Sequence, residues 1–202
     1  MVRGWGTLAV VLVLVCLGLA QFGGAATRMP SKTPKTGGTP SPKESSKAHT
    51  YGTVRKVLSA VNLVVTTPDI PSMSVRLMGV EPPVVSREAG DGGKAIPGQP
   101  YGTEAEMYIR DLLLDKQVQL DTYGKDRKGR TLAVVWLCDI NVNVTLVTQG
   151  LAWVSPSIPI ANVRVELEVA GRQAQVARYG LWGLPDPESP WEFRKHHHLP
   201  AE

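Results

Sequence analysis

Short runs rich in valine and leucine begin at Tyr51 and are separated by turn-like stretches. Branched apolar residues fit the pleated, half-buried surface of a sheet, so this pattern predicts β-strands. The five runs lie at residues 53–58, 63–67, 73–80, 118–123 and 132–138. The segment 124–130, rich in glycine and charged residues, is the turn predicted to join the last two strands.

Between the third and fourth runs the apolar residues change to helical spacing. They form one stripe made of Ala105, Ile109, Leu112 and Leu113. Thr103 and Glu106 stand three residues apart, which is the spacing of a capping box. The sequence therefore predicts a helix that begins near Thr103.

Two further helices are predicted after the fifth run. Residues 143–150 suit a short helix closed by Gly150. A longer amphipathic helix is indicated by spacings of four and three, and Gly180 ends it. Its apolar positions are Val163, Leu167, Ala170, Ala174 and Ala177.

The predicted order is three strands, a helix, two strands and further helices. This order predicts an α+β fold that is mainly β, built as a five-stranded Greek-key barrel of the oligonucleotide/oligosaccharide-binding (OB) type with about three helices. OB barrels bind their ligands across one face and its loops. The fold alone does not give the function.

The first 26 residues have the organisation of an export signal. Arg3 precedes a continuous apolar run at 8–20, and Gly24, Ala25 and Ala26 offer a small-residue cleavage site. That run is shorter than the roughly 20 residues of a membrane span, which favours cleavage. If the apolar stretch is extended to residue 26, an uncleaved membrane anchor is the alternative. We expect an exported protein, periplasmic or secreted, or one anchored to the membrane through residues 1–26 alone.

Residues 27–50 are rich in proline, serine, threonine and lysine and predict a disordered basic linker. The predicted barrel domain is 51–195, followed by a disordered tail at 196–202. Residues 1–50 carry a net charge of +5 and residues 51–202 a net charge of −1, so the basic character belongs to the leader and linker. A phosphate-binding surface on the domain therefore needs a local cluster of basic residues. Cys16 lies in the leader and Cys138 is predicted in the core, which leaves the domain without an internal disulfide.

Five blocks of the sequence, in the same order, resemble the staphylococcal-nuclease (thermonuclease-like) family. They lie at 75–81, 98–105, 126–133, 144–153, and in a closing segment formed by 180–182 and 190–194. The resemblance covers about residues 51–195 and implies hydrolysis of DNA and RNA phosphodiester bonds with one bound Ca²⁺. In that family two arginines stabilise the charge that builds up at phosphorus, and a glutamate activates water.

The resemblance assigns roles residue by residue. Arg76 and Arg130 match the two phosphate-clamping arginines, and Glu81 matches an aspartate that binds the metal. The catalytic glutamate is replaced by Val84, and a second metal-binding aspartate by Val61. Loss of a general base typically lowers the rate by about 10² to 10⁴.

A longer loop at 86–91 carries two carboxylates, Glu88 and Asp91, that offer a substitute base. Two hypotheses follow. The first is a domain with lost or much reduced phosphodiesterase activity that binds DNA, RNA or another anionic polymer, or an envelope protein. The alternative is an active Ca²⁺-dependent endonuclease that uses a substitute base. Without activity, no cofactor is expected.

Overall fold

The computed structural model describes residues 48–89 and 95–200 of this protein. Five strands form a barrel at the predicted runs, but β1 begins five residues earlier than predicted, at Ala48, and β3 ends three residues earlier, at Leu77. They are β1 (Ala48–Ser59), β2 (Asn62–Thr66), β3 (Met73–Leu77), β5 (Gln117–Lys125) and β6 (Thr131–Leu137). Two short strands, β4 (Val80–Glu81) and β8 (Trp153–Val154), pair with each other, and β7 (Ile140–Asn141) pairs antiparallel with the end of β6.

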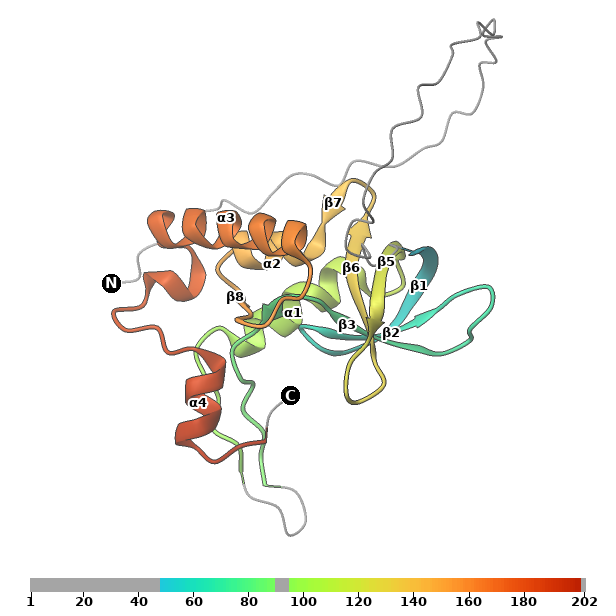
Figure 1. The fold of residues 1–202 in the computed structure, drawn as a ribbon. Helices are drawn as coiled ribbons and strands as arrows, with labels where there is room; N and C mark the ends of the chain where they lie inside the picture. Colours follow the sequence, from blue (N-terminus) through green and yellow to red (C-terminus); the bar gives the residue numbers. More distant parts are fainter. Residues whose placement is uncertain (1–47, 90–94, 201–202) are drawn as a thin grey trace, which may run out of the picture. The chain divides into compact units, whose positions relative to one another are not determined.

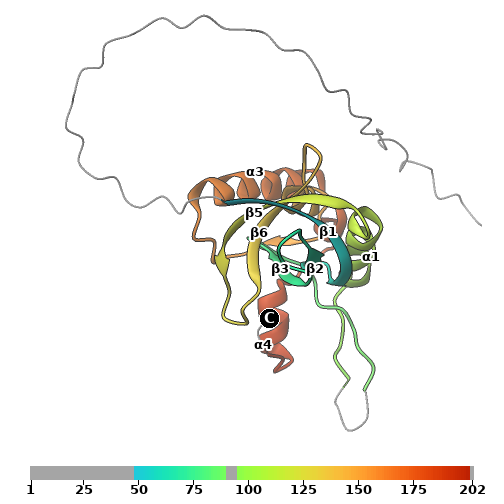
Figure 2. The ribbon, with the colours of Figure 1, turned by 90° about the vertical axis from the view of Figure 1, so that its right-hand side faces the viewer.

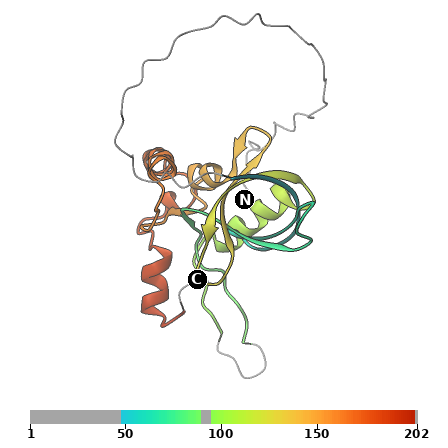
Figure 3. The same cartoon turned by 45° about the vertical axis from the view of Figure 1, so that its right-hand side comes forward.

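The barrel closes through one parallel pairing. Neighbouring strands pair antiparallel in the order β3-β2-β1-β5-β6, and β3 then pairs parallel with β6. Figure 3 shows these strands curving into a ring. The predicted five-stranded OB-type barrel with helices is confirmed.

Four α-helices accompany the barrel in the described part of the chain, one more than predicted. They are α1 (Gly102–Leu113), α2 (Val142–Thr148), α3 (Ala161–Ala177) and α4 (Pro190–His196), with a 3₁₀ turn at Gly180–Gly183. Helix α1 directs Ala105, Ile109 and Leu113 into the core. Helices α2 and α3 lie side by side, and α4 lies apart from them beside the loop that follows β4 (Figures 1 and 2).

Two predictions about individual residues are wrong. Thr103 and Glu106 do not form a capping box, because α1 begins at Gly102 after a left-handed Tyr101 that makes no side-chain cap. Glu106 instead accepts a hydrogen bond from Arg110 one turn later, at 2.8 Å. Cys138 is exposed in the β6–β7 turn and lies outside the core, since the chain turns back there with a positive φ of 52°.

Tryptophan packing attaches the C-terminal segment to the domain. Trp153 on β8 makes edge-to-face contacts with Trp182 and with Trp191 on α4, with ring centroids 4.4 and 5.8 Å apart. Gln99 adds a polar link, because its amide oxygen accepts from the Val84 backbone and its amide nitrogen donates to the Glu188 carbonyl. Helix α4 is thereby held beside the segment that follows Glu81.

The predicted export segment lies outside the described residues, as does the predicted linker up to residue 47. Strand β1 begins at Ala48, and the last described residue is Pro200. No helix within 48–89 and 95–200 is long and apolar enough to cross a membrane.

Candidate phosphate-binding site

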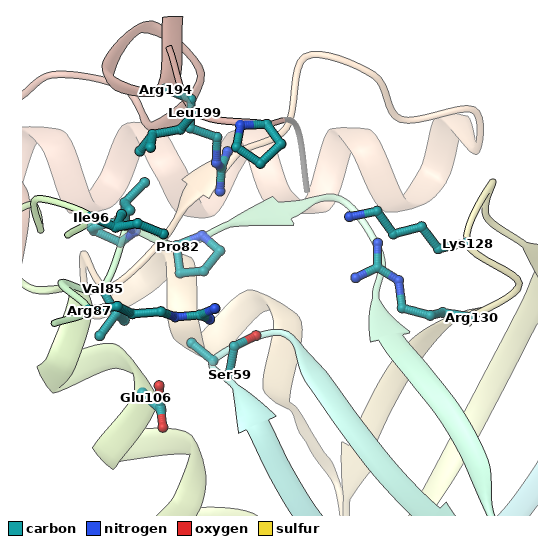
Figure 4. A pocket seen from close by; sticks show the side chains of 14 residues that line it. Ser59, Pro82, Val85, Arg87, Ile96, Glu106, Lys128, Arg130, Arg194 and Leu199 are labelled. Atoms are coloured by element: carbon teal, nitrogen blue, oxygen red, sulfur yellow. The ribbon is translucent and has the colours of Figure 1, made fainter. Parts of the chain in front are cut away.

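A cavity of about 270 Å³ lies where the β1–β2 turn, the segment after β4, the β5–β6 turn and helix α4 meet. Four basic residues line it: Arg87, Lys128, Arg130 and Arg194. Figure 4 shows them entering from different elements, with Arg194 coming from α4, Arg87 from the loop, and Lys128 and Arg130 from the β5–β6 turn. Glu106 on α1 is the one carboxylate among the described lining residues, and Arg110 pairs with it. Convergent positive charge of this kind attracts anions even on a domain of near-neutral net charge.

The β5–β6 turn fixes Arg130 through a single carboxylate. Asp126 Oδ1 accepts from the backbone nitrogens of Lys128 and Arg130, both at 2.9 Å, and Oδ2 accepts from Arg130 Nε at 2.7 Å. Burial tends to raise the pKa of Asp126, but the hydrogen bonds and charge of Arg130 and the Lys128 N–H hold that pKa below its usual range. The turn therefore presents Arg130 to the cavity in one defined orientation.

We expect the Asp126→Asn substitution to destabilise the protein at neutral pH and to have less effect in acid. A carboxyl whose pKa is lower in the folded state contributes stability above the unfolded value of about 3.9, and that contribution is lost as the pH falls through the folded pKa. The free energy of urea unfolding, measured for both proteins from pH 7 to pH 3, should show the difference shrinking below about pH 4. Asp115→Asn removes a largely exposed carboxylate and is the matched control. A difference that stays constant across this range would contradict the assignment.

The β1–β2 turn holds the other side of Arg130. Asn62 Oδ1 accepts from Arg130 Nη1 at 2.8 Å, and Asn62 Nδ2 donates to Ser59 Oγ at 2.8 Å. Asn62 is also the register partner of Arg76 across β2 and β3. The two predicted phosphate-clamping positions are therefore connected through one asparagine.

Arg76, which is buried, and Glu81, which is half-buried, form an ion pair next to the cavity. Arg76 Nη2 donates to Glu81 Oε1 at 2.8 Å, and their side chains are 8% and 18% exposed. Neither residue is among those that line the cavity, whereas Arg130 is. Arg194 connects the two groups, because it lines the cavity and its Nη1 lies 3.8 Å from Glu81 Oε2.

The two positions at which carboxylates are missing differ in their surroundings. Val61 is fully buried in the hydrophobic core, and its carbonyl accepts a hydrogen bond from the Leu77 N–H. Val84 lines the cavity. Glu88 is exposed and lies outside the cavity lining, and Asp91 lies outside the described residues.

These residues do not fit a calcium ion. Ca²⁺ takes about six to eight oxygen ligands, usually including several carboxylates. Here Glu81 is the carboxylate at the predicted metal position, and an arginine lies against each of its oxygens. The part of the chain that the structure describes holds no group of three or more histidine, cysteine, aspartate or glutamate side chains arranged to bind a metal.

Comparison with known proteins identifies the family. A family model described as staphylococcal nuclease homologue matches residues 74–183, more than half of the chain. The chain belongs to the staphylococcal nuclease family. Its barrel is the nuclease-type domain, and both Arg76 and Arg130 fall within the matched residues, while Arg194 lies beyond them.

The matches with three relatives each extend over most of the relative's length. The thermonuclease of Staphylococcus intermedius is 33% identical over 131 residues, which is 64% of this chain and 74% of that protein. An uncharacterized endonuclease of Haemophilus influenzae is 30% identical over 142 residues, 70% of this chain and 71% of the relative. A micrococcal nuclease of Shigella flexneri is 28% identical over 163 residues and matches 70% of this chain and 92% of its own.

Sequence reasoning gave no role to three of the basic residues at this nuclease-type site. Arg194 belongs to a block that carried the resemblance, yet it lies far from Glu81 along the chain. Arg87 lies in the loop whose carboxylates offer a substitute base, and Lys128 lies in the turn that carries Arg130. An excess of basic residues was an available signal for Lys128 in segment 124–130, but not for Arg87, whose loop at 86–91 carries more acidic than basic residues. Only the fold brings these side chains to one cavity.

Proposed function

We propose that this protein binds nucleic acid through the phosphate-binding cavity and that its phosphodiesterase activity is lost or much reduced. The observation that carries the proposal is the composition of the cavity: four basic side chains converge there, and Glu106, its one described carboxylate, is paired with Arg110. Guanidinium groups present a fixed set of donors to phosphate oxygens, whereas hydrolysis also requires a group that activates water.

The residues that line the cavity are better suited to binding a phosphate group than to hydrolysing a phosphodiester bond. Arg130 and Arg194 can donate to phosphate oxygens, and Lys128 adds a further positive charge. Val84 neither binds metal nor takes a proton. Glu106 Oε1 accepts from Arg110 Nη2 at 2.8 Å, so it is held on α1 by its own neighbour.

The test combines binding and cleavage on the purified full chain. Fluorescence anisotropy with a labelled single-stranded oligodeoxynucleotide, and with the RNA of the same sequence, measures affinity in the presence of Ca²⁺ or of EGTA. Gel electrophoresis of the same samples measures cleavage. We expect binding that weakens with salt, and cleavage no faster than that of an Arg130→Ala variant.

The competing hypothesis, an active Ca²⁺-dependent endonuclease with a substitute base, makes the opposite prediction. Cleavage that needs Ca²⁺ and disappears in the Arg130→Ala variant would establish it and would make Glu106 and Glu88 the carboxylates to substitute next. Absence of binding to either nucleic acid would instead favour a protein partner in the cell envelope.

We further propose that the domain acts outside the cytoplasm, exported as a periplasmic or secreted protein or tethered to the membrane by residues 1–26. Support comes from the sequence alone: a short positive start, an apolar run and small residues at 24–26. N-terminal sequencing of the protein recovered from its native host distinguishes a cleaved signal from a retained anchor, and a cytoplasmic protein starting at Met1 would contradict both.

A further inference from the structure

The C-terminal helix places a fixed positive charge on the carboxylate expected to bind metal. Arg194 Nη1 lies 3.8 Å from Glu81 Oε2, on the opposite carboxylate oxygen from Arg76. The side chains of Arg194 and Glu81 are only 11% and 18% exposed. An ion pair shielded in this way is screened by solvent far less than a surface pair.

Several contacts hold α4 in the position from which Arg194 reaches Glu81. Ser189 caps the helix by accepting from the Glu192 N–H, and Pro190 occupies its first turn. Phe193 is buried, and Trp191 packs edge-to-face on Trp153 of β8, the strand whose register pairs Trp153 with Glu81 itself. Arg194 is thus carried by a helix fixed to the same strand pair as its partner.

We propose that Arg194 takes the electrostatic place of the metal ion, so that the cavity binds phosphodiesters without Ca²⁺. This inference rests on the proposed function and extends it to a residue beyond the part matched by the family. A divalent cation at Glu81 would face two guanidinium groups of like charge. Arg194 also lines the cavity, so its guanidinium offers donors to a bound phosphate while it neutralises Glu81.

Arg130 completes the proposed site from the opposite side. Figure 4 shows Arg194 and Arg130 entering the cavity from separate elements. The ligand is a phosphodiester group of a nucleic acid, because the site offers fixed charge-assisted donors to phosphate oxygens and its described lining has no aromatic side chain for a base to stack on. Affinity should therefore depend on salt and vary little with base sequence.

The test compares the full chain with Arg194→Gln in two independent measurements. Anisotropy with a labelled single-stranded oligodeoxynucleotide should give the same affinity for the wild type in EGTA and in Ca²⁺. Arg194→Gln should bind about tenfold more weakly in EGTA, the loss of one charge-assisted contact. Arg194→Lys keeps the charge and should recover most of the affinity. Arg172→Gln removes the same charge from an exposed position on α3 and is the matched control.

Calorimetric titration with CaCl₂ alone tests the same idea without nucleic acid. Arg194→Gln should bind Ca²⁺ at least about tenfold more tightly than the wild type, because one of the two repelling charges is gone. The double variant Arg194→Gln with Glu81→Gln should lose this increase in Ca²⁺ affinity. Circular dichroism establishes that each variant is folded.

The outcomes separate this inference from the proposed function. Oligonucleotide binding by the wild type that requires Ca²⁺, or that Arg194→Gln leaves unchanged, overturns the inference while nucleic-acid binding stands. Absence of any oligonucleotide binding overturns the proposed function and, with it, phosphodiester binding without Ca²⁺; the calcium titration then decides only whether Arg194 takes the electrostatic place of the metal ion. In the calcium titration, equal Ca²⁺ affinities for the wild type and Arg194→Gln would also overturn the inference that Arg194 takes the place of the metal ion.

Discussion

Replacing Arg87 and Arg130 together by alanine is expected to lower the affinity for single-stranded DNA about a hundredfold. Both residues line the cavity, and a hydrogen bond to a charged group contributes about 1.5–3 kcal/mol, so the lower end of that range gives roughly tenfold for each arginine. The dependence on salt should change as well. Two fewer phosphate contacts reduce the slope of log K against log salt concentration by about 1.4 for a single strand.

A matched double variant controls for the lost charge. Arg55 and Arg172 are exposed and pair with Asp115 and Glu168 outside the cavity, so Arg55→Ala with Arg172→Ala removes the same charge. We expect this control to bind within about threefold of the wild type, since charges far from a site are largely screened. Equal losses of affinity in the two double variants would mean that general charge, and not the cavity, binds the nucleic acid.

Asn143→Ala is expected to cause the largest loss of stability, about 4 kcal/mol. Asn143 is 1% exposed, and its amide joins β6 to the end of β3: Oδ1 accepts from the Val135 N–H, and Nδ2 donates to the carbonyls of Met78 and Ala133. Alanine leaves the Val135 N–H and the Met78 carbonyl without this partner inside the core. Each buried group left unsatisfied costs about 1–3 kcal/mol.

Thermal and urea unfolding measure this loss. At about 2–4 °C per kcal/mol for a domain of this size, the melting temperature should fall by roughly 8–16 °C. Asn162→Ala, at an exposed position on α3, is the control and should change stability by less than about 0.5 kcal/mol. A change of similar size in both variants would show that the amide of Asn143 does not join these strands.

The stability prediction concerns the framework that supports the cavity, and the binding prediction concerns the side chains that line it. Asn143 at the start of α2 ties β6 to the end of β3, from which the chain leads directly into Glu81. Arg130, Arg194 and Arg87 then act from turns, a loop and α4 around that framework. Binding residues placed on loops and element ends, supported by a rigid barrel, are the usual arrangement for a functional surface.

Local sequence was sufficient for most of the fold because barrel strands and amphipathic helices bury side chains at fixed periods. Leu63, Val65 and Val75 point into the core from the runs that predicted β2 and β3. The stripe containing Val163, Leu167 and Ala170 is the buried face of α3. The barrel was predicted, but the two strands that close it were not, since the parallel pairing of β3 with β6 joins segments far apart in the chain.

Errors arose where a local rule competed with tertiary contacts. Thr103 and Glu106 had the spacing of a helix cap, but Glu106 pairs with Arg110 and lines the cavity. Cys138 ended an apolar run and was expected inside, yet the turn into β7 exposes it. Sequence spacing cannot predict either result, because the first depends on where α1 begins and the second on where the chain turns into β7.

At the site, the amino-acid sequence is enough to say which side chains stand at the positions of the family: Arg76, Arg130 and Glu81 are present, and Val61 and Val84 replace carboxylates. How these side chains are paired is set by the fold. It buried Arg76 against Glu81, fixed Arg130 through Asp126 and Asn62, and brought Arg194 from the C-terminal helix to the second oxygen of Glu81. The physical reason is that electrostatic pairing depends on distance in space and burial, and neither can be inferred from separation along the chain.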